Sequence, residues 1–537
     1  MAQVAVAPTA NLQLLLDEAA EFNAQARRFL DGDIDEDTFR TFRLRRGIYG
    51  QRQPGVQMVR IKIPSGIVNA DQLRAMAEVA GEFGHGIGHI TTRQDVQIHF
   101  VPLVRVVEAL ERLAYSGLTT REACGNSVRN VTACAMAGHC PGQAFDVRPF
   151  SLAITQRFIR NPLTAALPRK FKISFSCSVT DCALGDIHDI GAAAVVRDGR
   201  RGFRLRVGGG LGPLPLIAQT LYEFVPVEEL GPVCDGILKV FDEHGNRQDK
   251  HRARMKFVLK QHGLEWFRQA VEEARRTYDS PPWDLPEPIA LSPGEPVWIT
   301  VPQGNLSAAE MQRLAGLAEK YGDGTVALMY TQDLLINGVL PRHRAALEAE
   351  LRASGFRLQG QDGLPDVITC PGAATCNLGI TRSMDLGAAV TKTLTAGDDP
   401  FLRQIKVRVS GCPNSCGHHH IGQIGFYGNS RKIDGESAPF YQLLIGGGKH
   451  GDTTRFGKAV LSIPARLAPE AVDRITKLYL DERTGGEDFV TFVDRAGVPR
   501  FRQLLADLPG ATGEDMLMDW GEEHRFTVKL GRGECAT

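Results

Sequence analysis

The sequence predicts an α+β protein built from two related halves that pack about a pseudo-two-fold axis. Three observations lead to this prediction: segments with strand and helix periodicity alternate, one unit occurs twice, and a proline-rich segment separates the two copies. The chain has 537 residues, which is too long for a single hydrophobic core, so we expect two to four domains.

The repeated unit is recognised by residues that recur at one constant spacing along the chain. Pro64 and Gly66 recur as Pro302 and Gly304. Two copies are too few to form a solenoid, so they indicate two halves of one module with a cofactor between them. Further identical pairs have the same spacing: Gly84 and Gly322, Gly86 and Gly324, Gln94 and Gln332, Asp95 and Asp333, and Ile98 and Ile336.

Periodicity also predicts individual elements. The strand expected near residue 60 is ended by Pro64-Ser65-Gly66, and six prolines between residues 281 and 296 indicate a semi-rigid, extended linker. We expect an amphipathic helix over residues 10–30, a strand over 59–63, a helix over 71–83, a strand over 89–100 and a helical region over 249–278.

Composition excludes several classes of protein. The formal net charge is zero and 43% of the residues are hydrophobic, so nothing global points to nucleic acid or to a membrane. Residues 1–22 lack the basic and apolar segments of a signal peptide, and no apolar run reaches the roughly 18 residues of a membrane span. Eleven cysteines, an odd number, fit metal ligation in a reducing cytoplasm better than a disulfide framework, so we expect a cytoplasmic protein.

Four cysteines in the second half form two pairs on loops rich in proline and glycine. Cys370 and Cys376 have five residues between them, and Cys412 and Cys416 have three. Four thiolates suit zinc or an iron–sulfur cluster, and five intervening residues exceed the usual spacing in structural zinc loops. The second pair follows a strand-like run over residues 405–410, which is a typical position for metal ligands. The alternative is that these are buried free cysteines.

The two copies diverge in charge. Arg60 and Lys62 share one strand face, and their counterparts are Trp298 and Thr300. The same loss of basic groups affects a second face, on which Arg93, Asp95, Gln97 and His99 correspond to Thr331, Asp333, Leu335 and Asn337. This second face is entirely polar and needs partners, which a ligand with several carboxylates would supply; the alternative is a solvated edge.

Further basic residues follow in the first half. Arg129 lies in an Asn-Ser-Val-Arg-Asn segment, and alternation places Lys170 and Lys172 on one strand face. When Cys177 is aligned with Cys412, the counterparts of the two lysines are Ile405 and Val407, which are apolar. Converging guanidinium and ammonium groups bind compact oxyanions by charge-assisted hydrogen bonds, so the first half is expected to hold a small anion.

The cysteine pattern, with Ser-Gly-Cys-Pro-Asn-Ser-Cys-Gly over residues 410–417, resembles that of the sirohaem/[4Fe–4S] sulfite and nitrite reductases. The resemblance covers nearly the whole chain. It implies that Cys370, Cys376, Cys412 and Cys416 hold a [4Fe–4S] cluster, with Cys416 also bridging to the sirohaem iron. It also implies two ferredoxin-like halves in one pseudo-two-fold module, with two further mixed α/β domains around the cofactors.

On this resemblance we divide the chain into an N-terminal helical and irregular segment (1–54), a first ferredoxin-like half (55–142), a first sirohaem and substrate domain (143–280), a linker with a second ferredoxin-like half (281–362), a second cofactor domain (363–525) and a tail (526–537). Cys535 in the tail is expected to be incidental. The basic segment over residues 43–53 is expected either near the cofactor or as a solvated loop.

The resemblance also assigns roles to the basic residues. The substrate-binding residues would be Arg60, Arg129, Lys170 and Lys172. Residues expected near the sirohaem are Arg93, Gln97, His99, Arg169 and Asn414, together with Cys416. The nitrite-reducing branch typically has Asn at the position of Lys172, so the sequence favours six-electron reduction of sulfite to sulfide. Nitrite reduction to ammonia, a cobalamin-pathway monooxygenase and a non-catalytic sirohaem carrier stay open as alternatives.

Electrons are expected to come from a separate protein. The glycine runs at residues 208–210 and 446–448 lack the Gly-x-Gly-x-x-Gly form of a dinucleotide site, so ferredoxin is the expected donor and a separate flavoprotein the alternative. A second cysteine set, Cys134 and Cys140 with Cys177 and Cys182, is interpreted either as buried thiols left by the duplication or as a second metal cluster, and it is not assigned.

Overall fold

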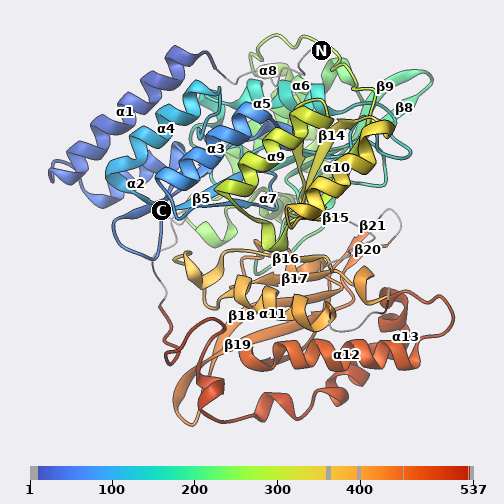
Figure 1. Cartoon of the computed structure of the whole chain (residues 1–537). Helices are drawn as coiled ribbons and strands as arrows, with labels where there is room; N and C mark the ends of the chain where they lie inside the picture. The colour runs from blue at the N-terminus through green and yellow to red at the C-terminus, as the bar shows by residue number, and fades with distance from the viewer. Residues whose placement is uncertain are drawn as a thin grey trace.

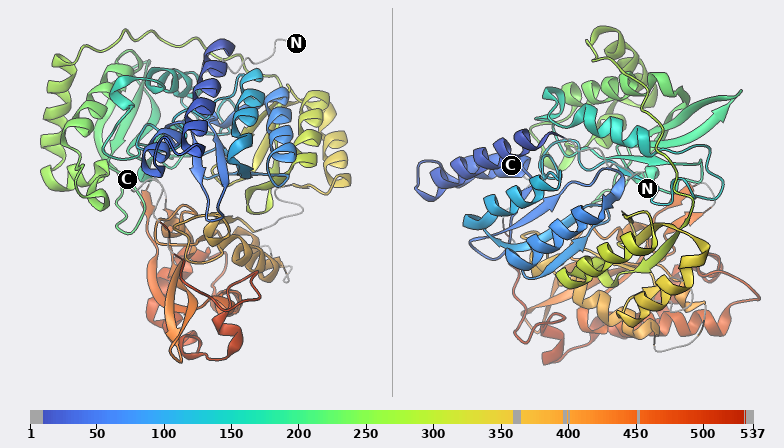
Figure 2. Two further views of the ribbon diagram at one scale, coloured as in Figure 1. Left: turned by 90° about the vertical axis from the view of Figure 1, so that its left-hand side faces the viewer. Right: turned by 45° about the horizontal axis from the view of Figure 1, so that its top comes forward.

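The computed structural model describes residues 10–358, 365–395, 399, 401–450, 453–529 and 531. Cys535 in the predicted tail lies outside the described residues. Three parts are seen in Figure 2: a module of sheets and helices in blue and yellow, a green domain, and an orange to red domain that ends near the C-terminus. None of the described helices has the length and apolar character needed to cross a membrane.

The N-terminal segment packs on the first half of the module. Helix α1 (Leu12–Leu30) matches the predicted helix and lies against α4 (Val106–Tyr115), as Figure 1 shows. Its buried stripe, spaced at helical periodicity, consists of Leu15, Ala19, Phe22 and Ala26. Helix α2 (Glu36–Arg45) follows and begins at Asp35, whose carboxylate accepts from the Thr38 amide at 2.7 Å.

The module contains two five-stranded sheets that exchange one strand each. One has the order β1-β2-β5-β4-β12 and the other β15-β11-β14-β13-β3, so β3 from the first half completes the second sheet and β12 completes the first. Helices α3 and α9 cover them side by side. The elements are β1 (Ile48–Gly50), β2 (Val56–Ile61), β3 (Ile67–Asn69), α3 (Ala70–Glu82), β4 (Ile87–Ile90), β5 (Val96–Pro102), β11 (Glu295–Thr300), β12 (Asn305–Ser307), α9 (Ala308–Tyr321), β13 (Thr325–Leu328), β14 (Leu334–Val339), α10 (Pro341–Ala353) and β15 (Arg357–Leu358).

Two glutamines show the pseudo-two-fold symmetry directly. Gln94 Nε2 donates to the Leu328 carbonyl at 2.9 Å, and Gln332 Nε2 donates to the Ile90 carbonyl at 3.0 Å. Both glutamines have left-handed backbone, with φ of 55° and 70°. Each therefore links one half to the other through a buried amide that reaches across the axis, and the predicted duplication is confirmed.

One predicted strand is wrong. Residues 89–100 form the hairpin of β4 and β5, because the backbone turns back where the Thr91 amide donates to the Asp95 carbonyl at 2.9 Å. Arg93 and Asp95 thus lie in a tight turn, and only Gln97 and His99 of the predicted polar face belong to the strand. The predicted helical region over 249–278 is divided in a similar way, because Gly263 has a φ of 85° between α7 and α8.

Each half also contributes a mixed domain with the same topology. In the sheets β10-β9-β8-β7-β6 and β22-β19-β18-β17-β16, the last three strands are parallel and the others antiparallel. The fold is thus the predicted α+β arrangement. The elements are β6 (Thr132–Ala133), α5 (Arg148–Phe158), β7 (Ile173–Ser176), β8 (Ile190–Arg197), β9 (Arg200–Val207), β10 (Gln219–Pro226), α6 (Leu230–His244), α7 (Met255–His262), α8 (Leu264–Thr277), β16 (Val367–Thr369), α11 (Ser383–Thr395), β17 (Val407–Ser410), β18 (Ile424–Ile433), β19 (Glu436–Ile445), β20 (Gly448–His450), β21 (Thr453–Arg455), β22 (Lys458–Pro464), α12 (Ala468–Glu482) and α13 (Phe489–Leu504).

Strand register corrects the alignment of the two halves by one residue. Ile190 donates its amide to the Lys172 carbonyl, and Ile424 donates in the same way to the Lys406 carbonyl. Lys172 therefore corresponds to Lys406, and the predicted counterparts Ile405 and Val407 are wrong. The alignment on cysteines failed because Cys177 and Cys412 do not occupy equivalent positions in their loops.

Candidate functional site

The two cysteine loops of the second half meet because their strands are parallel neighbours. Cys370 follows β16 and Cys412 follows β17, so both loops leave the same edge of the sheet. They touch through glycines: a Cβ on Gly411 would lie 2.7 Å from the Cα of Gly372. The Gly411 amide donates to the Cys370 sulfur at 3.3 Å. Small residues at this contact therefore let the two loops converge.

Burial and neighbouring thiols oppose the ionisation of Cys370, Cys376 and Cys412. Burial, together with the nearby Cys416 and Cys376, raises the pKa of Cys370 to about 12. Burial also raises the pKa of Cys412, as do the same neighbours. A cation bound by all four thiolates would remove this penalty, so the donor set fits a positively charged metal centre. Cys370 and Cys412 are buried, whereas Cys376 and Cys416 are exposed.

The basic N-terminal segment lies against the first cysteine loop. The Arg52 amide donates to the Thr375 carbonyl at 2.9 Å, and Gln53 Nε2 donates to the Ala374 carbonyl at 2.8 Å. Asn377 Nδ2 in turn donates to the Gly50 carbonyl. This segment is therefore not a solvated loop, and it covers the loop that carries Cys376.

The first-half cations gather beside the second cysteine loop. Burial lowers the pKa of Lys172 well below its ordinary value, and the positive charges of Arg93, Lys170 and Arg254 lower it further. Cys416 acts in the opposite direction, so its sulfur lies within electrostatic reach of the Lys172 ammonium group. Lys172 forms no ion pair with any described residue. This group of cations is the chemistry expected for binding an anion.

Arg93 is the most enclosed of these cations. Its guanidinium contacts His188 and donates to the carbonyls of Asn130 and Ile173, while its Nε is buried without a hydrogen-bond partner among the described residues. Burial lowers its pKa to about 9. A buried guanidinium with an unused donor fits an acidic cofactor, because a carboxylate would satisfy both the charge and the donor.

Three predicted residues lie together on adjacent strands. Arg60 on β2 is directly opposite Gln97 on β5, and its Nε lies 3.9 Å from Asp95 Oδ1. His99 Nε2 contacts the Gln97 side-chain amide at 3.1 Å. Burial lowers the pKa of His99 to about 3, so the ring is neutral near pH 7, and its Nδ1 is buried without a hydrogen-bond partner among the described residues.

The other predicted residues lie around this group. Arg129 is buried and donates to the carbonyls of Ala123 and Gly125 at 2.8–3.0 Å. Its charge acts on both Arg93 and Lys62. Arg169 is half-buried directly before Lys170, and Asn414 is exposed on the loop between Cys412 and Cys416. Asn414 contacts the Cys412 thiol through its backbone amide, which lowers the pKa of that thiol.

Sequence reasoning missed several residues at the same place. Arg254 pairs with the buried Asp189 at 2.8 Å, and Asp189 also accepts from the Lys172 amide at 2.8 Å. His188 and His418 are buried, and the pKa of each is lowered by burial and then by the charges of Arg93 and Lys172. The basic run over residues 250–256 was a signal for Arg254, but nothing in the sequence linked it to Asp189.

A large cavity lies away from these residues. It has a volume of about 740 Å³, and none of the predicted site residues lines it. Its walls include Trp298, Asp333 and Lys406, which are the second-half counterparts of Arg60, Asp95 and Lys172. This cavity is therefore the symmetry-related equivalent of the basic site, with most of the basic residues replaced.

Comparison with known proteins identifies the family. The model of the nitrite and sulphite reductase 4Fe–4S domain matches residues 124–277 and 360–509, which is more than half of the chain. The model of the nitrite/sulfite reductase ferredoxin-like half domain matches residues 49–115 and 297–354. Each model matches once in each half, as the duplication requires.

Individual relatives span nearly the whole chain. An assimilatory ferredoxin-dependent nitrite reductase of Haloferax mediterranei is 29% identical over 526 residues, covering 90% of this chain and 89% of the relative. A ferredoxin sulfite reductase of Mycolicibacterium paratuberculosis is 28% identical over 495 residues, covering 85% and 88%. The solved structure of the Mycobacterium tuberculosis NirA protein has a TM-score of 0.78 at 27% identity and covers 87% of this chain and 92% of its own. This chain belongs to the family of ferredoxin-dependent nitrite and sulfite reductases, and its cofactors are a [4Fe–4S] cluster and sirohaem.

Proposed function

We propose that this chain reduces sulfite to sulfide with six electrons that ferredoxin supplies one at a time. The observation that carries this proposal is the position of Lys172. Its ammonium group lies among the charges of Arg93, Lys170 and Arg254, and the Cys416 thiol is within electrostatic reach. An oxyanion held by these cations would lie beside the loop to which we assign two cluster ligands.

We assign the residues to three roles. When bound, the cluster and sirohaem supply electron storage and the iron at which the anion is reduced. Cys370, Cys376, Cys412 and Cys416 would hold the cluster, and Cys416 would also face the sirohaem. Arg93, Gln97, His99, Arg169 and Asn414 would hold the sirohaem. The substrate is held by Arg60, Arg129, Lys170 and Lys172.

Proton supply supports the same assignment. Reduction of sulfite to hydrogen sulfide ion consumes six electrons and seven protons and releases the three oxygen atoms as water. Lysines with lowered pKa values release protons more readily near neutral pH, and burial lowers the pKa of Lys62 to about 8. We propose that Lys62 and Lys172 hold the protons that the departing oxygen atoms take up.

Sulfite and nitrite are distinguished by one residue. Both anions are named among the relatives, so the relatives do not select between them. Lys172, in place of the Asn typical of the nitrite-reducing branch, favours sulfite, because an ammonium group adds charge for a dianion. Nitrite reduction to ammonia on the same scaffold is the second candidate, and it is favoured by the match to the Haloferax enzyme.

The deciding experiment compares kcat/KM for sulfite and nitrite on the fully loaded enzyme with reduced ferredoxin as donor. We expect the larger value for sulfite, and we expect Lys172→Asn to shift the ratio toward nitrite by roughly tenfold or more, the cost of one charged hydrogen bond. Lys406→Asn, at the equivalent position in the other half, is the matched control and should leave the ratio unchanged. A larger wild-type value for nitrite would replace sulfite by nitrite in the proposal.

The electron donor is tested separately. Ferredoxin is proposed because relatives are named for it, and a separate flavoprotein is the alternative. Turnover with reduced ferredoxin at rates well above those with a reduced flavoprotein is the expected result. The reverse order would assign the flavoprotein as donor and leave the substrate proposal untouched.

A further inference from the structure

The unassigned first-half cysteines lie at positions related by symmetry to the proposed cluster ligands. The Ala133 amide donates to Gln94 Oε1, and the Thr369 amide donates to Gln332 Oε1 in the same way. Because Gln94 and Gln332 are equivalent, the next residues in each chain segment, Cys134 and Cys370, are also equivalent. Both are followed by a second cysteine after five residues, so Cys140 corresponds to Cys376.

In the second cysteine loop, one cysteine occupies a position equivalent to that of a second-half cysteine, and the other does not. Leu184 and His418 have matching left-handed backbone, with φ of 59° and 60°, and each precedes a short 3-10 turn. Cys182 and Cys416, each two residues earlier, therefore occupy equivalent positions in the two halves. Cys177 directly follows the end of β7, where Gly411 follows the end of β17, so it occupies the position of a glycine and not that of Cys412.

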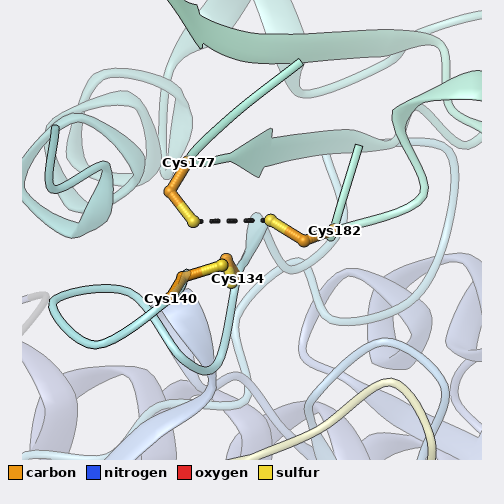
Figure 3. Close-up of side chains that lie close together, drawn as sticks. All are labelled: Cys134, Cys140, Cys177 and Cys182. Atoms are coloured by element: carbon orange, nitrogen blue, oxygen red, sulfur yellow. Dashed lines mark hydrogen bonds between the residues drawn. The ribbon is translucent and has the colours of Figure 1, made fainter. Parts of the chain in front are cut away.

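This shift by one residue brings the first-half sulfur atoms together. In the second half, the Gly411 amide touches the Cys370 sulfur at 3.3 Å. A cysteine at the equivalent position places its own sulfur beside that of Cys134. The four sulfur atoms of Cys134, Cys140, Cys177 and Cys182 accordingly all lie within 4.8 Å of one another, and those of Cys177 and Cys182 are 3.4 Å apart. Figure 3 shows the two pairs facing each other from their separate loops.

These distances select the kind of metal centre. With zinc–sulfur bonds of about 2.3 Å, the sulfur atoms of a tetrahedral site are about 3.8 Å apart, in the range observed here. A cubane cluster carries each cysteine on a different iron atom, so its sulfur atoms must stand farther apart than around one ion. Among the described residues, only this group brings three or more Cys, His, Asp or Glu ligand atoms close enough for one ion.

We propose that Cys134, Cys140, Cys177 and Cys182 bind a single Zn²⁺ ion as a tetrahedral tetrathiolate site. The four intervening residues between Cys177 and Cys182 are usual for such sites, and the five between the other pair are one more than usual. In the second half, five residues between two cysteines argued against zinc. The same spacing is not decisive here, because the four sulfur atoms already lie at distances that fit one zinc ion. This site goes beyond the proposed reductase function and uses none of its residues.

The surroundings indicate a structural site. Cys134 and Cys177 are buried, Cys140 and Cys182 are partly exposed, and four cysteine ligands would fill all four positions of a tetrahedral ion. Within the loop from Cys134 to Cys140, Met136 packs on a cluster that includes Ile67 and Ala327 of the exchanged strand pair β3 and β13. The ion would hold this loop in place against the sheet that both halves build.

The first test measures zinc, iron and acid-labile sulfide in holoenzyme purified without oxygen. We expect about one zinc per chain beside about five irons and four sulfides, the content of one cluster and one sirohaem. Zinc-edge X-ray absorption should show four sulfur neighbours at about 2.3 Å. Extra iron in this site in place of zinc, as a single ion or as a second cluster, would overturn the proposal.

The second test locates the ion. Cys140→Ala should lose the zinc while iron and sulfide stay at wild-type levels, and Cys234→Ala, a buried cysteine on α6 outside both sets, is the matched control that should keep it. Nitrogen or oxygen neighbours in the absorption spectrum, or zinc-free wild-type protein with two disulfides, would also reject the site. Both of these results come from the wild-type protein, so they decide whether the zinc site exists even if a variant does not fold.

Discussion

The two halves carry the same pair of loops on the same sheet, yet their cysteines are arranged for different chemistry. In the second half, glycines at 372 and 411 let the loop backbones touch, and the third cysteine lies one residue beyond the contact. In the first half, the third cysteine occupies the contact position itself, and the four sulfur atoms lie within 4.8 Å. A displacement of one residue along a loop thus separates a site proposed for a cluster from a site proposed for one ion.

The halves differ in charge as well as in sulfur geometry. The basic site of the first half has Arg60, Arg93 and Lys172, whereas the equivalent cavity of the second half has Trp298, Thr331 and Lys406. That cavity is also lined by three carboxylates, Asp333, Asp366 and Asp488, and burial followed by the charge of Asp366 raises the pKa of Asp333 to about 7. The first-half site therefore has more basic residues than its copy, in which, among the described residues, only Arg403 and Lys406 line the cavity as basic residues.

The largest expected effect tests the equivalent cysteines of the two sites. Cys416→Ser should lose iron and sulfide and lower the turnover rate by more than roughly 100-fold, since even residues that only support metal ligands cost that much. Cys182→Ser should instead lose zinc and retain the iron. Metal analysis of both variants and a ferredoxin-linked assay of the first decide this. Wild-type iron content and activity in Cys416→Ser would refute its role as a ligand.

An intermediate effect is expected from the equivalent lysines. Lys172→Gln removes a charged hydrogen-bond donor, which costs about 1.5–3 kcal/mol, so kcat/KM for the anion should fall roughly 10- to 100-fold. Lys406→Gln, at an exposed position, should change kcat/KM by no more than about twofold. Steady-state kinetics with sulfite and nitrite measure both. Equal losses in the two variants would show that the first-half site has no special role in anion binding.

The smallest expected effect concerns the buried carboxyl of the second half. Asp333 accepts hydrogen bonds from the Val301 amide and the Trp298 ring, and its folded pKa of about 7 lies above the unfolded value of about 3.9. The folded protein therefore holds the proton more tightly, so stability is greatest below about pH 4 for this group and is lost as the pH rises to about 7.

This dependence is measured by urea unfolding at pH 5 and pH 8. Asp333→Asn should show a smaller loss of stability between the two pH values than the wild type. Asp284→Asn, which changes an exposed carboxylate on the linker, is the control and should behave like the wild type. Parallel behaviour of Asp333→Asn and the wild type would show that Asp333 does not carry this titration.

The duplication and the paired second-half cysteine loops could be predicted because each is marked by short motifs that are recognisable in the sequence. The recurrence of Pro64 and Gly66 as Pro302 and Gly304 marks a repeated turn, and both pairs form the same short 3-10 turn in the structure. The roles of the individual site residues stay predictions until the variants are measured. The hairpin at residues 91–95 was missed because its polar residues alternate as they would in a strand, and only the Thr91–Asp95 hydrogen bond reveals the turn.

Residue types and their spacing, which the sequence alone determines, established two related halves, four thiols on paired loops and an excess of cations in one half. Tertiary structure decided the rest: the exchange of β3 and β12, the pairing of Arg254 with Asp189, and the gathering of four first-half sulfur atoms. The physical reason is register. Equivalence between strands is set by hydrogen bonds to neighbouring strands, and a slip of one residue moves every side chain to another face.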